Sequence, residues 1–456
     1  MLAHTLGNGK RSNSRPLAVD GFKAVSEILP LLRAKTIEFG PLHEIPLIMA
    51  EDYQDGFGDI LPALKLAEGL ASNFPGCKPA LYVPEEAYAM FGRVYPNFDP
   101  KKSSNIVNGI AINKKTRERE IPGPVHIFFA LKLDAVSAGY AYFLGEAPIN
   151  IYLEEYDAYR RTPLPGKLRL NTCYADSAGN VHVVANTGFR ADALGIHIDR
   201  SLDGIQTAPD IGMRTELLKK ILGGNDALNL ERFVNANWGM AYHRPGDSYI
   251  KYAHLAGSGN PAKPSVLFEI TQANMDYFPT IGCYRDLMET TAQVHVKNGN
   301  AVLLNPIKPM EQQGTIMLHI GIQPHDVFLR LLAQSDLPVC VMGDASAAEA
   351  ITLGKMFTYY AVSWKEDFAR NMMQLSKKLF GKKLGERVSK LMGAASDSCE
   401  MNDVIPRAYW ENDPALQEAF REFGRYSRER MDIITKVSTL IRDGLALYEK
   451  HNGIRI

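Results

Sequence analysis

Short runs of apolar residues alternate along the chain with segments in which apolar residues recur every three or four positions. The runs have the continuity of buried parallel strands, and the periodic segments predict amphipathic helices. In the first half we expect strands at Ile45–Ala50, Ala80–Val83, Val125–Leu131 and Ile149–Leu153, and helices at Ile60–Phe74, Glu85–Tyr95 and Ala135–Leu144. This alternation predicts a parallel sheet covered by helices on both faces.

Two segments interrupt the pattern. Leu168–Ile198 has polar strands around an Ala-Gly-Asn turn, which is typical of a hairpin or an irregular connection. Asp203–Gly212 is rich in Gly, Pro and Asp, which indicates a linker.

Alternation then restarts. We expect strands at Arg232–Asn237, Ser265–Ile270, Ala301–Leu304, Ile316–Ile320, Val339–Met342 and Phe357–Val362, and helices at Ser248–Ala256, Asp326–Ser335 and Ala345–Leu353. From Lys365 onward the pattern is helical only, and it ends in a long amphipathic stretch over Pro414–Glu449. The chain therefore divides into a tail (1–20), two doubly wound α/β domains (21–205 and 206–375) and C-terminal helices (376–456). Ligands of such sheets bind at the carboxyl ends of the strands, so we expect a cleft between the domains to hold the site.

Composition narrows the class of protein. The 456 residues carry 51 Lys and Arg against 51 Asp and Glu, and 46% of them are apolar. These values exclude a largely disordered chain and argue against a nucleic-acid coat or a polybasic membrane anchor. Five scattered cysteines without a C-x-x-C motif are typical of a reducing compartment, so we expect a cytoplasmic protein. No apolar run is long enough for a transmembrane segment.

The first segment that could carry chemistry is Asp55-Gly56-Phe57-Gly58-Asp59, between the first strand and the first long helix. Its glycines allow a tight turn and close approach to a ligand. Either carboxylate could act as a general base at the carboxyl edge of the sheet. The alternatives are that Asp59 caps the helix and that Asp55 is a plain loop residue.

The second segment runs from Gly343 to Ala350, after a strand and into a helix. Free N–H groups at a helix start bind phosphate well, Ser346 could add a hydroxyl, and Glu349 could reach ribose hydroxyls. The alternative is a capping box, because Ser346 and Glu349 have its spacing.

The third segment, Gln323-Pro324-His325-Asp326, follows another strand of the same half. Its backbone and His325 could bracket a nucleobase. The alternative is a surface turn in which Asp326 caps the next helix.

Other motifs are missing from the sequence. It has no P-loop, no G-x-S-x-G elbow, no D-x-D and no cluster of His and Cys, so a divalent metal site is not indicated. The basic run from Lys377 to Lys390 is more typical of a solvated helix face than of a nucleic-acid site.

Taken together, the segments resemble glycosyltransferases of the two-domain GT-B type. Their layout is similar to the protein-arginine rhamnosyltransferases that modify elongation factor P, and more distantly to heptosyltransferases and the peptidoglycan N-acetylglucosaminyltransferase. The matching segments are Asp55–Asp59, Thr187-Gly188-Phe189-Arg190 through Leu194-Gly195-Ile196, Phe233–Asn237, Pro324-His325-Asp326 through Leu331-Leu332 to Asp336, and Gly343–Ser346 followed by Gly354–Phe357. The chain departs from the family pattern at Asp344 and Ala345 (family Glu and Asp), at Asn235 and Ala236, and at His325 (family Gln). These departures lie where the family touches nucleotide and sugar, so the donor need not be dTDP-rhamnose.

The resemblance implies a bacterial, metal-independent, inverting glycosyltransferase of the hexosyltransferase type, with no cofactor besides its substrate. A sugar would move from a nucleotide-sugar donor, dTDP-rhamnose or another, to an acceptor such as a protein arginine. Catalysis would fall to Asp59, with Asp55 beside it and Asp344 holding the sugar or acceptor. The donor-binding residues would be Gly58, Asn237, Pro324, His325, Ala345, Ser346 and Glu349. The alternatives are a sugar-nucleotide epimerase or hydrolase, or a non-catalytic nucleotide-sugar-binding protein.

Overall fold

The computed structural model describes most of the chain. The described residues are 46–49, 60–74, 78–83, 85–114, 127–131, 149–154, 172–175, 181–190, 193–223, 230–243, 248–270, 290–297, 300–304, 309–362, 365–394 and 405–441. These residues form two β-sheets and the helices that cover them.

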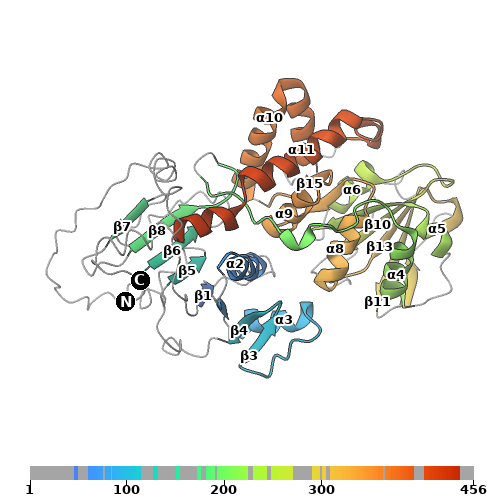
Figure 1. The fold of residues 1–456 in the computed structure, drawn as a ribbon. Coiled ribbons are helices and arrows are strands. Elements are labelled where there is room, and N and C mark those ends of the chain that lie inside the picture. Colours follow the sequence, from blue (N-terminus) through green and yellow to red (C-terminus); the bar gives the residue numbers. More distant parts are fainter. Residues whose placement is uncertain are drawn as a thin grey trace, which may run out of the picture.

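The first sheet has the order β3-β4-β2-β1-β5-β6-β8-β7 (Figure 1). Its strands are β1 Pro46–Met49, β2 Ala80–Val83, β3 Ser104–Val107, β4 Ile110–Lys114, β5 Ile127–Leu131, β6 Ile149–Glu154, β7 Thr172–Ala175 and β8 Val181–Asn186. The six strands from β4 to β8 in this order are parallel, whereas β3 and β7 are antiparallel edges. Numbered along the chain, the parallel strands follow the doubly wound order 3-2-1-4-5-6, whose connections reverse direction between β1 and β5.

The second sheet has the order β12-β11-β13-β10-β9-β14-β15. Its strands are β9 Asn237–Tyr242, β10 Ser265–Ile270, β11 Thr291–Lys297, β12 Asn300–Leu304, β13 Thr315–His319, β14 Val339–Val341 and β15 Phe357–Tyr359. Only β12 runs antiparallel to its neighbour. Every residue of β10 and β13 is buried, as expected for strands covered on both faces. The connections reverse direction between β9 and β14.

The helices cover these sheets and connect them to the C-terminal region. They are α2 Ile60–Asn73, α3 Glu85–Val94, α4 Ile211–Leu222, α5 Leu230–Val234, α6 Ser248–Ala256, α8 His325–Gln334, α9 Asp344–Thr352, α10 Glu366–Met392 and α11 Pro414–Arg430. Their ends follow local chemistry. The Asp210 side chain caps α4, which ends at Gly223 in the left-handed conformation, and Asp413 caps α11 ahead of Pro414.

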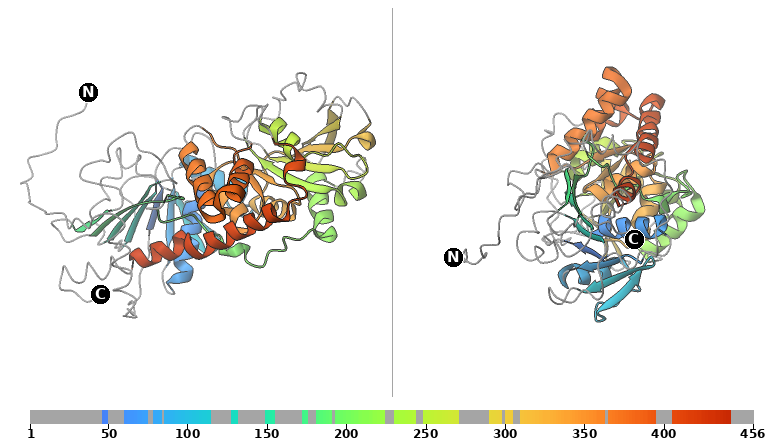
Figure 2. Two further views of the ribbon diagram at one scale, coloured as in Figure 1. Left: turned by 90° about the horizontal axis from the view of Figure 1, so that it is seen from above. Right: turned by 60° about the vertical axis from the view of Figure 1, so that its left-hand side comes forward.

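The chain crosses twice between the two sheets. The first crossing follows β8, and the second follows α11, which lies along the second sheet and leads back toward the first (Figure 2). Residues 433–441 are helical again, and Ile433, Val437 and Ile441 are buried in the core of the first sheet. The crossings touch, because the Ile196 N–H donates to Met431 O (2.8 Å) and the Ile433 N–H donates to Ile196 O (3.0 Å).

The α/β class expected from the sequence is confirmed, with two mostly parallel, doubly wound sheets and C-terminal helices. The expected hairpin is also present as β7 and β8. One strand was wrong: Leu230–Val234 is the helix α5, and Asn237 begins β9 instead of ending a strand. The β3–β4 hairpin and β11 were not predicted. The long amphipathic stretch is interrupted at Met431 and Asp432. The expected tail and the helix 135–144 lie outside the described residues.

The basic run lies on a helical hairpin. Helix α10 breaks at Gly381 (φ 72°), and the Ser376 and Ser389 hydroxyls meet at 2.9 Å between its halves. Lys377 and Lys378 are exposed near this break, in keeping with a solvated face. None of the helices in the described part of the chain is long and apolar enough to cross a membrane.

Candidate functional site

The start of α9 lies where the second sheet is expected to bind a ligand. Strand β14 ends at Val341, beside the reversal point between β9 and β14, and Gly343 turns the chain into α9 with φ 96°. Such a φ favours glycine, which also has no side chain to cap the helix. The first N–H groups of a helix have no partner inside it, so the segment from Asp344 to Ser346 offers donors to an anion.

Ser346 is not part of a capping box. Gly343 is the N-cap residue, and the Ser346 hydroxyl donates back to the loop, within 2.8 Å of Met342 O and 3.0 Å of Gly343 O. Ala345 and Ser346 are both buried at the first turn of α9. The hydroxyl therefore holds the loop against the helix start.

Asp344 is engaged by two side chains of the second half. Its Oδ1 accepts from the Tyr359 hydroxyl (3.0 Å), and its Oδ2 lies 2.9 Å from the Lys365 ammonium. Asp344 is buried, with 5% of its surface exposed. Its two contacts link α9 to β15 and to the start of α10.

Glu349 is the centre of a buried ion cluster that joins both halves of the molecule. Its Oε1 accepts from the Lys65 ammonium at 2.6 Å and lies 2.9 Å from His325 Nε2. Lys65, on α2, also lies 2.8 Å from Asp199 Oδ2 in the first crossing. We call Lys65, Asp199, Glu349 and His325 the Lys65 cluster. Lys65, Asp199 and Glu349 are all buried, so their charges depend on one another for stabilisation.

The pKa values of this cluster follow from burial and pairing. Burial lowers the pKa of Lys65, but Glu349 and Asp199 outweigh it and raise that pKa above its ordinary value. Burial raises the pKa of Glu349, but Lys65 and His325 outweigh it and lower that pKa. Asp199 shows the same balance, with Lys65 and Ser201 lowering its pKa. The cluster is therefore an ammonium between two carboxylates at neutral pH.

His325 and Pro324 come from the loop after β13. Pro324 is the N-cap residue of α8, and Asp326 lies in the first turn, where it pairs with Lys220 instead of capping the helix. The His325 ring is stacked on Phe328, with centroids 6.2 Å apart and planes 13° apart. The structure thus brings His325 and Glu349 together, as expected for two segments at one sheet edge.

Sequence reasoning missed Lys65 and Asp199. The available signal was the position of Lys65 between Leu64 and Leu66, in a helix where most neighbours are apolar. Its partner Asp199 precedes the expected linker and carries no motif. Asp55, Gly58 and Asp59 lie outside the described residues, directly before the first residue of α2.

A second unpredicted group of polar residues lies along the same sheet edge. Glu269 near the end of β10 is next to His319 at the end of β13, and it pairs with His243 just after β9. Burial, with His243 and His295 nearby, lowers the pKa of His319 to about 3. Among the described residues, no three His, Cys, Asp or Glu side chains are arranged to hold a metal ion.

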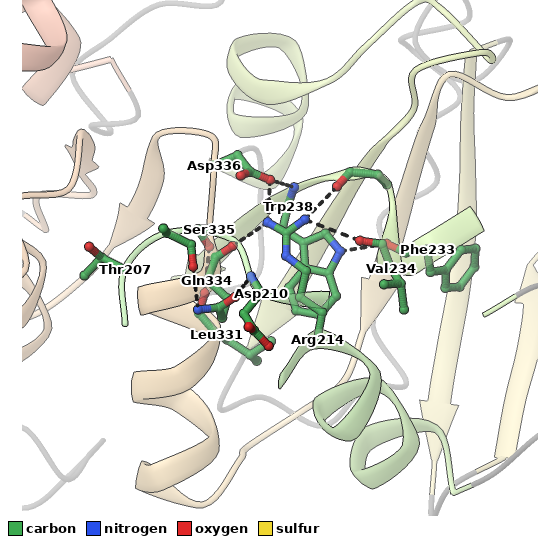
Figure 3. Close-up of polar contacts among 12 residues, drawn as sticks. Thr207, Asp210, Arg214, Phe233, Val234, Trp238, Leu331, Gln334, Ser335 and Asp336 are labelled. Carbon is green, nitrogen blue, oxygen red and sulfur yellow. Dashed lines mark hydrogen bonds and ion pairs between the residues drawn. The ribbon is translucent and has the colours of Figure 1, made fainter. Parts of the chain in front are cut away.

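Asn237 lies at the opposite, amino edge of the second sheet, because it begins β9 and is in register with Ser265 at the start of β10. The structure therefore does not bring it together with His325, Ser346 and Glu349. This edge holds a different buried cation, Arg214 (Figure 3). The guanidinium donates to Val234 O, Ala236 O and Gln334 O and pairs with Asp336 Oδ2 at 2.6 Å. It also lies 4.7 Å from the centroid of the Trp238 ring.

No family model and no curated protein matches the chain. Solved structures with a similar fold include one described as the structural basis for EarP-mediated arginine glycosylation of translation elongation factor EF-P. It is 14% identical, spans 88% of this chain and 99% of that one, and has a TM-score of 0.44. Sucrose-phosphate synthase from Thermosynechococcus elongatus is 10% identical over 88% of this chain and 99% of that one, with a TM-score of 0.46. Anabaena Alr3699/HepE in complex with UDP and glucose is 11% identical over 88% and 98%, with a TM-score of 0.42.

Proposed function

We propose that the protein is a glycosyltransferase that takes its sugar from a nucleoside diphosphate sugar. The observation that carries the proposal is the contact between Lys65 and Glu349. It sets α2, the helix that follows Asp55 and Asp59 in the sequence, against α9, the helix whose start offers free N–H groups. The contact joins α2 and α9 from opposite halves of the chain, which supports a site that combines carboxylates ahead of α2 with anion donors of α9.

The donor half of the proposal rests on α9 and α8. A diphosphate at the start of α9 would be stabilised by N–H groups and by the positive end of the helix dipole. Lys65 and His325 both contact Oε1 of Glu349, and Oε2 accepts no hydrogen bond from another described residue. In the proposal Oε2 accepts a ribose hydroxyl, which requires the cluster to open, because the Glu349 side chain is 1% exposed. His325, on the same edge and stacked on Phe328, would contact the base.

The reaction would be a single displacement. An acceptor nitrogen or oxygen attacks the anomeric carbon on the side opposite the diphosphate, and the bond from that carbon to the diphosphate oxygen breaks. The diphosphate leaves as an anion on the helix start, and the acceptor proton passes to Asp59. Where the acceptor is a guanidinium, Asp55 and Asp59 together would bind it bidentately.

The test is donor turnover in wild type and in Asp59→Ala and Asp55→Ala. A panel of dTDP, UDP and GDP sugars is incubated with protein fractions, and nucleotide release and acceptor mass are measured. Loss of a general base is expected to slow release by about a hundredfold or more. Asp367→Ala, a partly exposed residue at the start of α10, is the control. Wild-type turnover in both aspartate variants, with fold intact, would refute the assignment.

The same assay separates the alternatives. Conversion or cleavage of a donor without any acceptor would indicate an epimerase or hydrolase. Nucleotide binding without release under any condition would indicate a binding protein.

A further inference from the structure

A cavity of about 660 Å³ lies where the chain crosses between its two sheets. It is lined by the end of α9 at Thr352–Gly354, by the second half of α11, and by residues of both crossings, namely Arg200, Asp432, Thr435 and Lys436. Helix α9 has nine residues, so its two ends are about 13 Å apart at 1.5 Å per residue. The cavity is therefore separate from the candidate site at the start of α9.

The cavity wall is strongly basic. The acidic lining residues are Glu429 and Asp432. The basic lining residues are Arg200, Arg421, Arg425, Arg428, Arg430 and Lys436. In a chain whose overall charge is zero, such a concentration of positive charge around a hollow favours an anionic ligand.

Some of these cations already have structural partners. Arg428 binds Thr352 O and Asp203, and Arg200 lies 3.1 Å from Asp432. Arg421 and Arg425 face glutamates three residues earlier on α11, and such exposed pairs are weak. Arg430 and Lys436 have no ion pair with another described residue. They are the charges that a ligand could neutralise.

Partial burial is unfavourable for the positive charge of Lys436. Burial lowers the pKa of its ammonium, although Asp432 raises it in part. Asp432 is already paired with Arg200, so it compensates the partly buried ammonium only in part, and an anion in the cavity would offset the remaining cost.

We propose that this cavity binds a compact phosphate anion of the orthophosphate or diphosphate class. Its volume lies in the range of small-molecule sites, and its guanidinium groups match phosphate oxygens. A ligand there would contact α9, α11 and both crossings at once, so it would stabilise one arrangement of the two sheets. The inference is independent of what the start of α9 binds.

A site-resolved test uses pyridoxal 5′-phosphate as the probe. Its aldehyde condenses with a lysine amine, releasing water, and borohydride reduces the imine to a stable secondary amine that mass spectrometry locates. Labelling of Lys436 is expected to exceed that of Lys101, an exposed lysine of the first half. Pyrophosphate at ten times its dissociation constant is expected to reduce labelling of Lys436 about tenfold and leave that of Lys101 unchanged. Pyridoxal, which lacks the phosphate, is expected to show no preference for Lys436. Equal labelling of both lysines, or no protection by pyrophosphate, would overturn the proposal.

Calorimetry supplies the second measurement and distinguishes the sources of phosphate. Orthophosphate, pyrophosphate and sulfate are titrated into wild type, Arg430→Gln/Lys436→Gln and the control Lys377→Gln/Lys378→Gln. Each lost charge-assisted contact is expected to weaken pyrophosphate binding about tenfold at this site, and the control is expected to leave it unchanged. Tighter binding of pyrophosphate than of orthophosphate would assign the diphosphate class, and the reverse order the orthophosphate class. Equal binding of sulfate and both phosphates, or equal affinity in both double variants, would contradict a phosphate site.

Discussion

Two clusters in the described part of the chain are each built around one buried basic side chain, and they differ in what surrounds the charge. Arg214 is held by three backbone carbonyls, one carboxylate and an aromatic face, all from the second half of the chain. We call Arg214, Trp238, Gln334 and Asp336 the Arg214 cluster. Lys65 is held by two carboxylates, Asp199 and Glu349, which come from a crossing and from the opposite half.

The difference indicates different roles. Backbone carbonyls cannot leave Arg214 without unfolding α5 and the end of α8, so its position is fixed by the fold. Gln334 adds to this arrangement, because its amide binds Gln206 O and Asp210 N–H and thereby holds the linker. The partners of Lys65 are side chains, which a ligand can replace or share. The Arg214 cluster is therefore structural, and the Lys65 cluster is the one suited to binding.

The largest effect is expected from Arg214→Met. It leaves three buried carbonyls without the guanidinium donor. Asp336, which is 23% exposed, loses its ion pair but keeps the Trp238 N–H. Removal of one partner from a buried pair costs about 3–5 kcal/mol. We expect the free energy of unfolding, measured in urea, to fall by the upper end of that range. A fall below about 1 kcal/mol would show that the cluster does not hold this edge together.

Lys65→Met is expected to cost less, about 3 kcal/mol, because Glu349 keeps His325 as a partner. Lys65→Met leaves both Glu349 and Asp199 without the ammonium. Adding Glu349→Gln removes one of these two charges, so the double variant should lose less than the sum of the single losses. Urea unfolding of all three variants gives this coupling energy. Strict additivity would mean that Lys65 and Glu349 do not interact in solution.

Acid is expected to act on the Lys65 cluster through its neighbour His197. Burial, with Lys65 nearby, lowers the pKa of His197 from 6.5 to about 3. The unfolded chain therefore takes up this proton first, and stability falls as pH drops through the window from 6.5 to 3. Between pH 7 and 5 we expect His197 to contribute a loss of about 1–2 kcal/mol. His197→Gln should remove that contribution from the pH dependence of the free energy of unfolding. An unchanged pH dependence would contradict the assignment.

The smallest effect is expected from Lys220→Met. Lys220 pairs with Asp326 at 3.0 Å, but both side chains are more than half exposed. Such pairs contribute about 0–1 kcal/mol, so urea unfolding should change by about 0.5 kcal/mol or less. A loss as large as that of Lys65→Met would show that this exposed pair contributes as much to stability as the buried Lys65 cluster.

The sequence predicted the parts of the fold that depend on local pattern. Strands such as Ser265–Ile270 and helices such as Ser248–Ala256 were predicted to the residue. Their buried positions are apolar in a continuous or periodic pattern, which can be recognised in the sequence. The strand expected at Arg232–Asn237 failed, because a short apolar run does not distinguish a buried helical turn from a strand.

The site was predictable only in part. Pro324, His325, Ser346 and Glu349 were predicted from their positions after strands, and the structure places His325 beside Glu349. Their actual partners were not, since Lys65 meets Glu349 across 284 residues and no local pattern records such a contact. The capping box had the right spacing, but Gly343 takes the cap position and Glu349 bonds across the molecule instead.

The central claim, that the Lys65 cluster binds a nucleoside diphosphate, is tested most directly by calorimetric titration of dTDP, UDP, GDP and ADP. The titrations compare wild type, Glu349→Gln and Lys355→Gln, a change beside the Arg214 cluster, where Lys355 binds Thr207 O and Ser335 O. We predict that wild type and Lys355→Gln bind at least one of these nucleotides equally well and that Glu349→Gln binds it about tenfold more weakly. Absence of binding to all four, or equal binding by Glu349→Gln and wild type, would contradict the account.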